Sequence, residues 1–123
     1  MQSLAQTLGV LGEELAYHYL IKKGYKILLR NYKSPLGEID LIAKEKGALV
    51  FIEVKTRSSE AMGSPAECVT PDKRRQLVKN AQYYIKRYGI HHVPCRFDVV
   101  SVLLPGEGEA VLDLIQNAFG ENG

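Results

Sequence analysis

Apolar residues recur along the chain with two different periods, and the change of period divides it into segments. Between residues 4 and 23 leucines recur every three or four positions, which predicts an amphipathic helix. Lys22 and Lys23 in the last turn and Gly24 after it are typical of a helix end. The leucines expected to form the inward face are Leu4, Leu8, Leu11 and Leu15.

The remaining periodic segments are shorter and alternate with turn residues. Thr70 and Pro71 suit the N-cap and first position of a second long helix. The order of segments predicts one α/β domain over residues 1–123, built on one mixed sheet, with residues 116–123 as a loose tail. The predicted segments are strands 25–32, 38–43, 48–56, 96–104 and 110–115, a helix from 71 to about 88, and a loop over 58–71.

The turn between the second and third predicted strands decides which acidic residues face each other. A two-residue loop at 46–47 pairs Asp40 with Glu53. A four-residue loop at 44–47 pairs Glu38 with Glu53 and leaves Asp40 diagonal on the same face. In both registers two carboxylates meet, which is destabilising unless a proton or a cation lies between them.

These carboxylates suggest metal chemistry. Two converging carboxylates suit Mg²⁺ or Mn²⁺, and the lack of histidine and cysteine nearby argues against zinc. Such a metal polarises a phosphoryl oxygen and lowers the pKa of a bound water. Lys55 shares a strand face with Glu53 and can orient that water or offset transition-state charge. The alternative is that Asp40, Glu53 and Lys55 form only a salt-bridged strand edge.

Composition narrows the function classes without choosing among them. No apolar run approaches the length of a membrane helix, and the first residues lack the features of a secretion signal, so we expect a cytoplasmic protein. Cys68 and Cys95 then stay reduced. All 16 lysines and arginines lie within residues 1–96, which is compatible with a phosphate-backbone partner.

The residues around the carboxylates resemble a known motif. Asp40, a 12-residue gap and Glu53-x-Lys55 resemble the PD-(D/E)xK motif of restriction-endonuclease-like nucleases, although Ile39 replaces the proline. The wider sequence is similar to the YraN family of small bacterial proteins over nearly its whole length. The segments that carry this resemblance are GEELA (12–16), GY (24–25), RNY (30–32), GEIDLI (37–42), FIEVKTR (51–57), RFDVV (96–100) and NAF (117–119).

The YraN family is itself similar to archaeal Holliday junction resolvases, and its members are predicted endonucleases. The resemblance implies a restriction-endonuclease-like three-layer fold: a central mixed sheet, an N-terminal helix, and a second long helix after the third strand. It also implies a Mg²⁺-dependent or Mn²⁺-dependent endonuclease acting on DNA, including branched DNA. A junction-cutting enzyme needs two sites, which would make the protein a homodimer.

The resemblance also assigns roles to individual residues. Asp40 and Glu53 would be the metal carboxylates, the Val54 carbonyl would complete the inner shell, and Lys55 would serve the water. In the resolvases the first helix contributes a further glutamate, and Glu13 matches it by its distance from Gly24.

The residues themselves also favour Glu13 as the helix acid. It shares an inward edge of the first helix with Ala16 and Leu20. A carboxylate is rarely buried without a partner, so its place there indicates a function. The alternative, Glu14, lies nearer the rim, where it can pair with His18. Glu38 is an alternative to Asp40 as a ligand.

Several basic or amide side chains are candidates for phosphate contacts. Lys73 and Gln76 share a face of the second helix, a position from which related nucleases supply a lysine or glutamine to the site. Surface solubility is the competing explanation for most of the others. The full set of expected nucleic-acid contacts is Arg30, Lys33, Arg57, Lys73, Gln76 and Arg96.

Two further function classes remain compatible with the sequence. One is a non-catalytic nucleic-acid-binding module that retains the fold. The other is a protein-interaction subunit that docks through the acidic residues between Glu107 and Glu121.

Overall fold

The computed structural model describes residues 3–58 and 69–120. Five strands form one sheet in the order β1-β2-β3-β4-β5, in which β3 and β4 pair in parallel and the other neighbours pair antiparallel. The elements are α1 (Leu4–Lys22), β1 (Lys26–Ser34), β2 (Gly37–Glu45), β3 (Ala48–Arg57), α2 (Pro71–Arg87), β4 (Cys95–Leu103) and β5 (Val111–Phe119).

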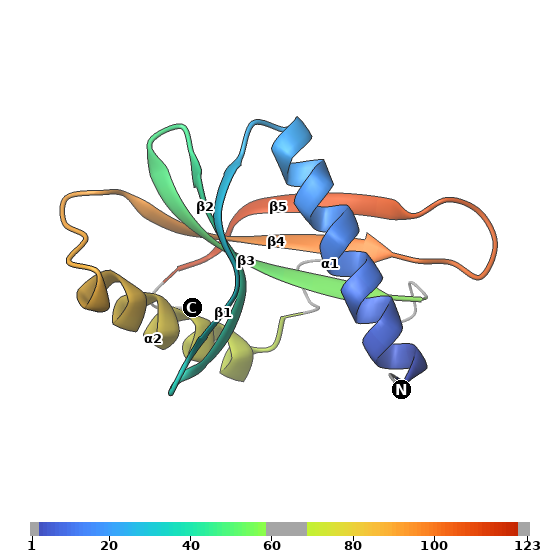
Figure 1. The fold of residues 1–123 in the computed structure, drawn as a ribbon, viewed down its shortest axis with the longest axis horizontal. Helices are drawn as coiled ribbons and strands as arrows, with labels where there is room; N and C mark the ends of the chain where they lie inside the picture. Colours follow the sequence, from blue (N-terminus) through green and yellow to red (C-terminus); the bar gives the residue numbers. More distant parts are fainter. Residues whose placement is uncertain (1–2, 59–68, 121–123) are drawn as a thin grey trace.

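The two helices cover opposite faces of the sheet, which gives three layers (Figure 1). On one face Leu77, Ala81 and Tyr84 of α2 pack against Phe51 and other buried side chains. On the other face α1 packs against residues of β2, β3 and β4. The predicted arrangement of a mixed sheet between an N-terminal helix and a helix after the third strand is therefore confirmed.

Helix α1 meets the sheet through Gly12, Ala16 and Leu20. Ala16 and Leu20 are fully buried, and Gly12 leaves no room for a Cβ because one would overlap Oγ1 of Thr56. The predicted leucine face is wrong in part, since Leu4 is 76% exposed and Leu11 is 48% exposed. The close approach of α1 to β3 at Gly12 leaves no room for a larger side chain there, and Leu4 and Leu11 stay exposed.

The turn between β2 and β3 has two residues. Glu45 pairs with Ala48 and the register continues to Leu41 opposite Ile52. Lys46 and Gly47 both have positive φ, at 50° and 81°, as a type I′ hairpin turn requires. This confirms the shorter of the two expected loops, in which Asp40 faces Glu53.

Helix α2 begins where the sequence predicts. The Thr70 side chain accepts a hydrogen bond from the Lys73 backbone N–H at 3.2 Å, and Pro71 occupies the first helical position. Most of the loop predicted over 58–71, including Cys68, lies outside the described residues. Cys95, the first residue of β4, is exposed, and its Sγ lies 3.5 Å from the Val93 carbonyl oxygen.

The end of the chain is more ordered than the sequence suggests. Residues 116–119, expected in a loose tail, belong to β5, and the Phe119 ring stacks on Phe97 with 5.0 Å between centroids. The tail prediction is wrong for these residues because this aromatic contact anchors the strand. Residues 121–123 lie outside the described part. Within the described residues, neither helix combines the length and the apolar character needed to cross a membrane.

Candidate functional site

Strands β2 and β3 separate at Asp40. Their pairing ends at Leu41 and Ile52. Ile39 packs on the α2 side of the sheet and Leu41 on the α1 side, whereas a regular strand would place both on one face. The strand therefore turns over at Asp40, and its side chain points into the gap between the strands. There its Oδ2 accepts a hydrogen bond from the Val54 backbone N–H at 2.8 Å.

Glu53 lies on β3, across this gap from Asp40 on β2. The residue is 7% exposed, and its carboxyl group interacts with that of Asp40. Burial is the largest cause that raises the pKa of Glu53, and hydrogen bonding and charge repulsion from Asp40 come next. Together they raise this pKa to about 9. The Lys73 Nζ of α2 lies 3.7 Å from Glu53 Oε2 and partly offsets this effect. The two carboxylates thus meet as the two-residue turn predicts.

Glu13 brings a third acid to Asp40 from α1. Burial, then repulsion and hydrogen bonding from Asp40, raise the pKa of Glu13 to about 7. Glu38 adds further repulsion, and Arg30 opposes it. Glu14 lies outside this group, because its Oε2 accepts from Arg30 at 2.6 Å and its Oε1 lies 3.2 Å from His18. The structure therefore brings Glu13, and not Glu14, to the carboxylates.

Asn31 is a site residue that the sequence-based prediction missed. It occupies the register position opposite Asp40, between the pairs Arg30–Leu41 and Tyr32–Ile39. Oriented with its nitrogen toward the acids, its amide donates to Glu13 Oε1 at 3.0 Å and to Glu38 Oε1 at 3.2 Å. Its φ of 54° lies in the left-handed region, which asparagine tolerates better than most residues.

The signal that would have found Asn31 is the turn between β1 and β2. Ser34 pairs with Gly37 across a two-residue connection. Counting back three positions on each strand places Asn31 opposite Asp40, so the same register argument that paired the carboxylates applies here.

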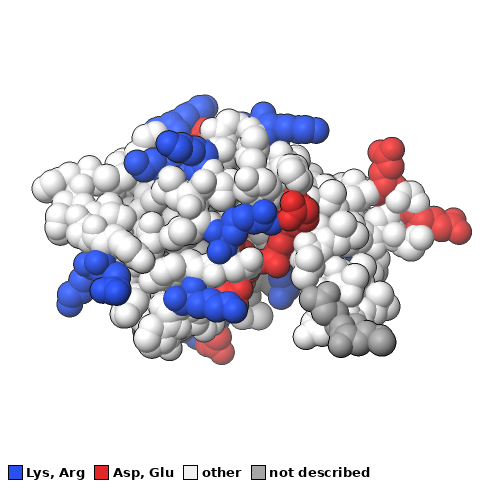
Figure 2. All heavy atoms as spheres, viewed as in Figure 1, with Lys and Arg blue, Asp and Glu red and all other residues white. Residues whose placement is uncertain are grey.

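Two adjoining hollows expose this group of side chains. Both are lined by Asp40, Val54, Lys55 and Lys73. The first, of about 430 Å³, also includes Glu53, and the second, of about 330 Å³, includes Glu13 and Glu38. In Figure 2, acidic side chains run along the junction of α1 and the sheet, with basic side chains on either side.

The side chains expected to contact nucleic acid differ in their exposure and in their partners within the protein. Arg30 pairs with Glu14 and lies over the Tyr17 ring at 4.2 Å, while Lys33 is exposed on β1. Arg57 is half-buried at the end of β3. Gln76 donates to the Leu36 carbonyl at 3.1 Å, so its side chain holds the β1–β2 turn. Lys73 is thus the α2 side chain that reaches the carboxylates.

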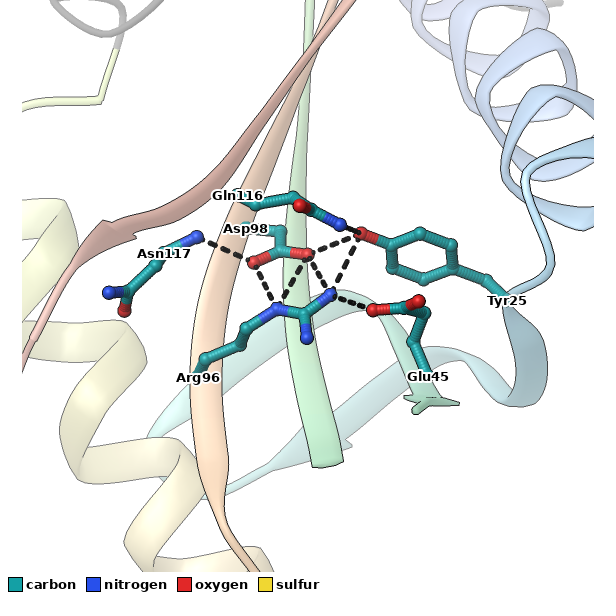
Figure 3. A network of polar contacts seen from close by, with 6 residues as sticks. All are labelled: Tyr25, Glu45, Arg96, Asp98, Gln116 and Asn117. Carbon is teal, nitrogen blue, oxygen red and sulfur yellow. Dashed lines mark hydrogen bonds and ion pairs between the residues drawn. The ribbon is translucent and has the colours of Figure 1, made fainter. Parts of the chain in front are cut away.

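Arg96 does not fit its predicted role as a nucleic-acid contact. Its guanidinium donates to Glu45 Oε1 at 2.7 Å and to Asp98 Oδ1 at 3.0 Å, and Asp98 is fully buried (Figure 3). Burial opposes the charge of Arg96, but its bonds to Asp98 and Glu45 outweigh this and raise its pKa. The Tyr25 hydroxyl donates to Asp98 at 2.7 Å, and Gln116 donates to Tyr25 at 2.8 Å. Arg96 is therefore committed to a structural network.

The acidic side chains Asp40, Glu53 and Glu13 form an open site and not a closed metal cage. In the described part of the chain, no three or more histidine, cysteine, aspartate or glutamate side chains are placed to hold a metal ion together. The strands present the pair Asp40 and Glu53, and Glu13 approaches Asp40 from α1. The role of Glu13 as a metal ligand stays a prediction.

Fold and site together define a three-layer α/β protein with paired carboxylates where two central strands separate. Residues 12–102 match the profile of the family described as "Uncharacterised protein family UPF0102". The chain belongs to this family, which confirms the resemblance to the YraN-like proteins.

Relatives of similar length support this membership. A UPF0102 protein of Symbiobacterium thermophilum is 46% identical over 116 residues, covering 94% of this chain and 98% of the relative. One from Syntrophomonas wolfei is 48% identical over 112 residues, covering 91% and 96%. Among solved structures, a repair endonuclease from Pyrococcus abyssi aligns with a TM-score of 0.39 and 19% identity, over 88% of this chain and 41% of that one.

Proposed function

We propose that this protein is a metal-dependent endonuclease that hydrolyses phosphodiester bonds in DNA, including branched or structured DNA. The observation that carries the proposal is the meeting of Asp40 and Glu53 between separated strands, beside Lys55 and Lys73. A fold gains no stability from two repelling carboxyl groups, one of them buried, so the arrangement calls for a functional reason.

The chemistry of these groups fits Mg²⁺ or Mn²⁺. Both carboxyl groups offer hard oxygen ligands, and repulsion from Asp40 opposes the ionisation of Glu53. A cation held by both would take the place of the proton on Glu53 and remove the repulsion. The Val54 carbonyl suits the same role: its N–H bonds Asp40, and the N–H and C=O of one strand residue point to the same side.

The bound metal would polarise a phosphoryl oxygen and lower the pKa of a water. Asp40 and Glu53 would hold it, and the hydrogen bond from Val54 N–H fixes the Asp40 carboxylate in place. Lys55, exposed on β3, would orient the attacking water and offset negative charge in the transition state. Lys73 would balance the charge of Glu53 when no phosphate is bound.

The charge around the site supports a nucleic-acid substrate. The side chains lining both hollows include Lys55 and Lys73, and Lys33 is exposed on neighbouring β1. A polyanion that brings its own phosphates suits this surface. We therefore propose DNA in the cytoplasm as the partner. A homodimer would supply the second site needed to cut both strands of a junction.

The test is cleavage of duplex, flapped and four-way DNA with Mg²⁺ or Mn²⁺. Asp40→Asn and Lys55→Ala should each abolish cutting. Glu14→Gln and Lys79→Ala are matched controls, because Glu14 pairs with Arg30 away from the carboxylates and Lys79 is exposed on α2. DNA binding without cutting on any substrate would instead identify a non-catalytic binding module.

Metal binding has a separate readout. The melting temperature of the wild type should rise with Mn²⁺, because a ligand that binds only the folded state stabilises it. Asp40→Asn should lose this rise and Glu14→Gln should keep it. Equal stabilisation of the Asp40→Asn variant would place the metal elsewhere and reject the site.

A further inference from the structure

Five exposed lysines gather at the end of the sheet remote from the carboxylates. They come from three neighbouring segments: the end of α1, the paired ends of β1 and β2, and the β2–β3 turn. Figure 2 shows basic side chains along this edge, where α1 ends and the turn projects. The members of this lysine edge are Lys22, Lys23, Lys26, Lys44 and Lys46.

Two of these lysines face each other directly. Lys26 of β1 is the register partner of Lys44 of β2. Like charges opposite each other in an antiparallel pair repel. A neutral residue at either position would remove this repulsion and keep the fold. The pair therefore costs stability, which a bound polyanion would recover.

A third lysine occupies a position that disfavours it. Lys46 has a φ of 50° in the type I′ turn, where asparagine, aspartate or glycine is preferred. Lysine adds a charge there at the expense of backbone strain. Lys46 also lines a hollow together with Lys23, whose ammonium lies 4.9 Å from the Tyr19 ring.

The local acids do not neutralise this edge. Glu45, the neighbour of Lys44 and Lys46, is buried and paired with Arg96. Asp113 of β5 is the exposed acid that borders the hollow of Lys23 and Lys46. Among the ion pairs between described residues, none includes a lysine of this edge.

We propose that the lysine edge binds the phosphate backbone of the same nucleic acid whose bond is cut at the carboxylates. This inference rests on the proposed nuclease function and extends it to the reach of the substrate. Lys44 follows Asp40 by four residues on β2, or about 13 Å at the usual rise of a strand. That is about four base pairs of duplex, so the substrate must continue at least this far from the reacting phosphate.

The experiment measures DNA binding in the non-cutting Asp40→Asn background by fluorescence anisotropy at several salt concentrations. The test variant carries Lys26→Gln, Lys44→Gln and Lys46→Gln. The control carries Lys79→Gln, Lys86→Gln and Arg87→Gln, which removes the same charge from exposed positions on α2. Melting curves confirm that both variants are folded.

Each lost phosphate contact should reduce the slope of log affinity against log salt by about 1. The test variant should therefore lose up to about 3 from this slope, and the control should lose none. Between 50 and 200 mM salt the parent should lose up to about 60-fold more affinity than the test variant. On a duplex too short to reach the lysine edge, parent and test variant should bind equally.

The possible failures are distinct. If the wild type cuts DNA but the test and control variants have the same salt slope, the lysine edge is not a nucleic-acid contact and only this inference is overturned. If the parent binds no DNA and the wild type cuts none, both this inference and the proposed function are overturned.

Discussion

Gly12 of α1 and Thr56 of β3 lie so close that a Cβ at Gly12 would overlap Oγ1 of Thr56 and lie 2.9 Å from its Cβ. This contact sets the distance between the helix and the sheet. Since Glu13 is the next residue, the same contact fixes how far its carboxyl group lies from Asp40.

Gly12→Ala should therefore destabilise the protein by overpacking, by about 1–3 kcal/mol. Gly9→Ala is the matched control, since a Cβ there would meet nothing within 4 Å and alanine favours a helix by about 1 kcal/mol. Urea unfolding of the two variants should give changes of opposite sign. A stabilised Gly12→Ala variant would show that α1 can move away from β3 freely.

Stability should fall as pH rises from acid to alkaline. In the folded chain the pKa of Glu13 is raised from 4.5 to about 7 and that of Glu53 to about 9, mainly by burial. Between these values the folded state holds protons that the unfolded chain has released, so raising the pH favours unfolding. The stability that these bound protons contribute is fully present below pH 4.5. It is lost as the pH rises through the raised pKa values of about 7 for Glu13 and about 9 for Glu53.

Thermal unfolding from pH 5 to pH 9 provides the measurement. Glu53→Gln, which needs no proton to stay neutral, should flatten the decline with pH. Glu14→Gln is the control and should leave it in place, because Glu14 does not contact the other carboxylates. A decline that survives unchanged in Glu53→Gln would assign it to other groups.

The Asn31 amide should favour the ionised form of Glu13. Asn31→Gly removes the donations to Glu13 and Glu38 but keeps the left-handed conformation available. We expect the pKa of Glu13 to rise further and stability to fall by about 1 kcal/mol. Asn31→Ala should cost about 1–2 kcal/mol more, since alanine disfavours this φ. NMR titration of Glu13 checks the first effect; an unchanged pKa in Asn31→Gly would exclude the bond.

Arg96 should matter for stability and not for DNA binding. Arg96→Ala leaves the carboxylate of Asp98 buried without its cation, which costs roughly 3–5 kcal/mol. Arg87→Ala, at an exposed position on α2, should change stability by less than about 0.5 kcal/mol. Denaturant titrations measure both. Loss of DNA affinity in a stably folded Arg96→Ala variant would restore Arg96 as a contact.

The sequence predicted the elements that depend on local pattern. Hydrophobic alternation located the strands, and the two-residue turn at Lys46 and Gly47 was enough to bring Asp40 to Glu53. The same kind of counting from the β1–β2 turn would have added Asn31. Where a hairpin register is fixed by its turn, the neighbours of a residue follow by arithmetic.

What the sequence could not predict depends on contacts between distant segments. Leu4 and Leu11 of α1 have helical spacing yet are exposed, whereas Gly12 and Ala16 meet the sheet, because the close approach of the helix selects for small side chains. In the sequence nothing distinguishes Arg96 from an exposed arginine, because its partners Glu45 and Asp98 come together with it only in the folded sheet. The turnover of β2 at Asp40 likewise has no periodic signal, since it is seen only from the opposite packing of Ile39 and Leu41.

The separation of bonded residues along the chain has a consequence for the order of folding. Asp40 and Val54 are 14 residues apart in a single hairpin, whereas Tyr25 and Asp98 are 73 apart. Closing the longer loop costs more chain entropy, so we expect the β2–β3 hairpin to form in the folding transition state and the Tyr25 network afterwards. In stopped-flow experiments, substitutions in the hairpin should slow folding, and Tyr25→Phe should mainly speed unfolding. The acid pair would then be assembled by the most local part of the chain before the rest of the fold closes around it.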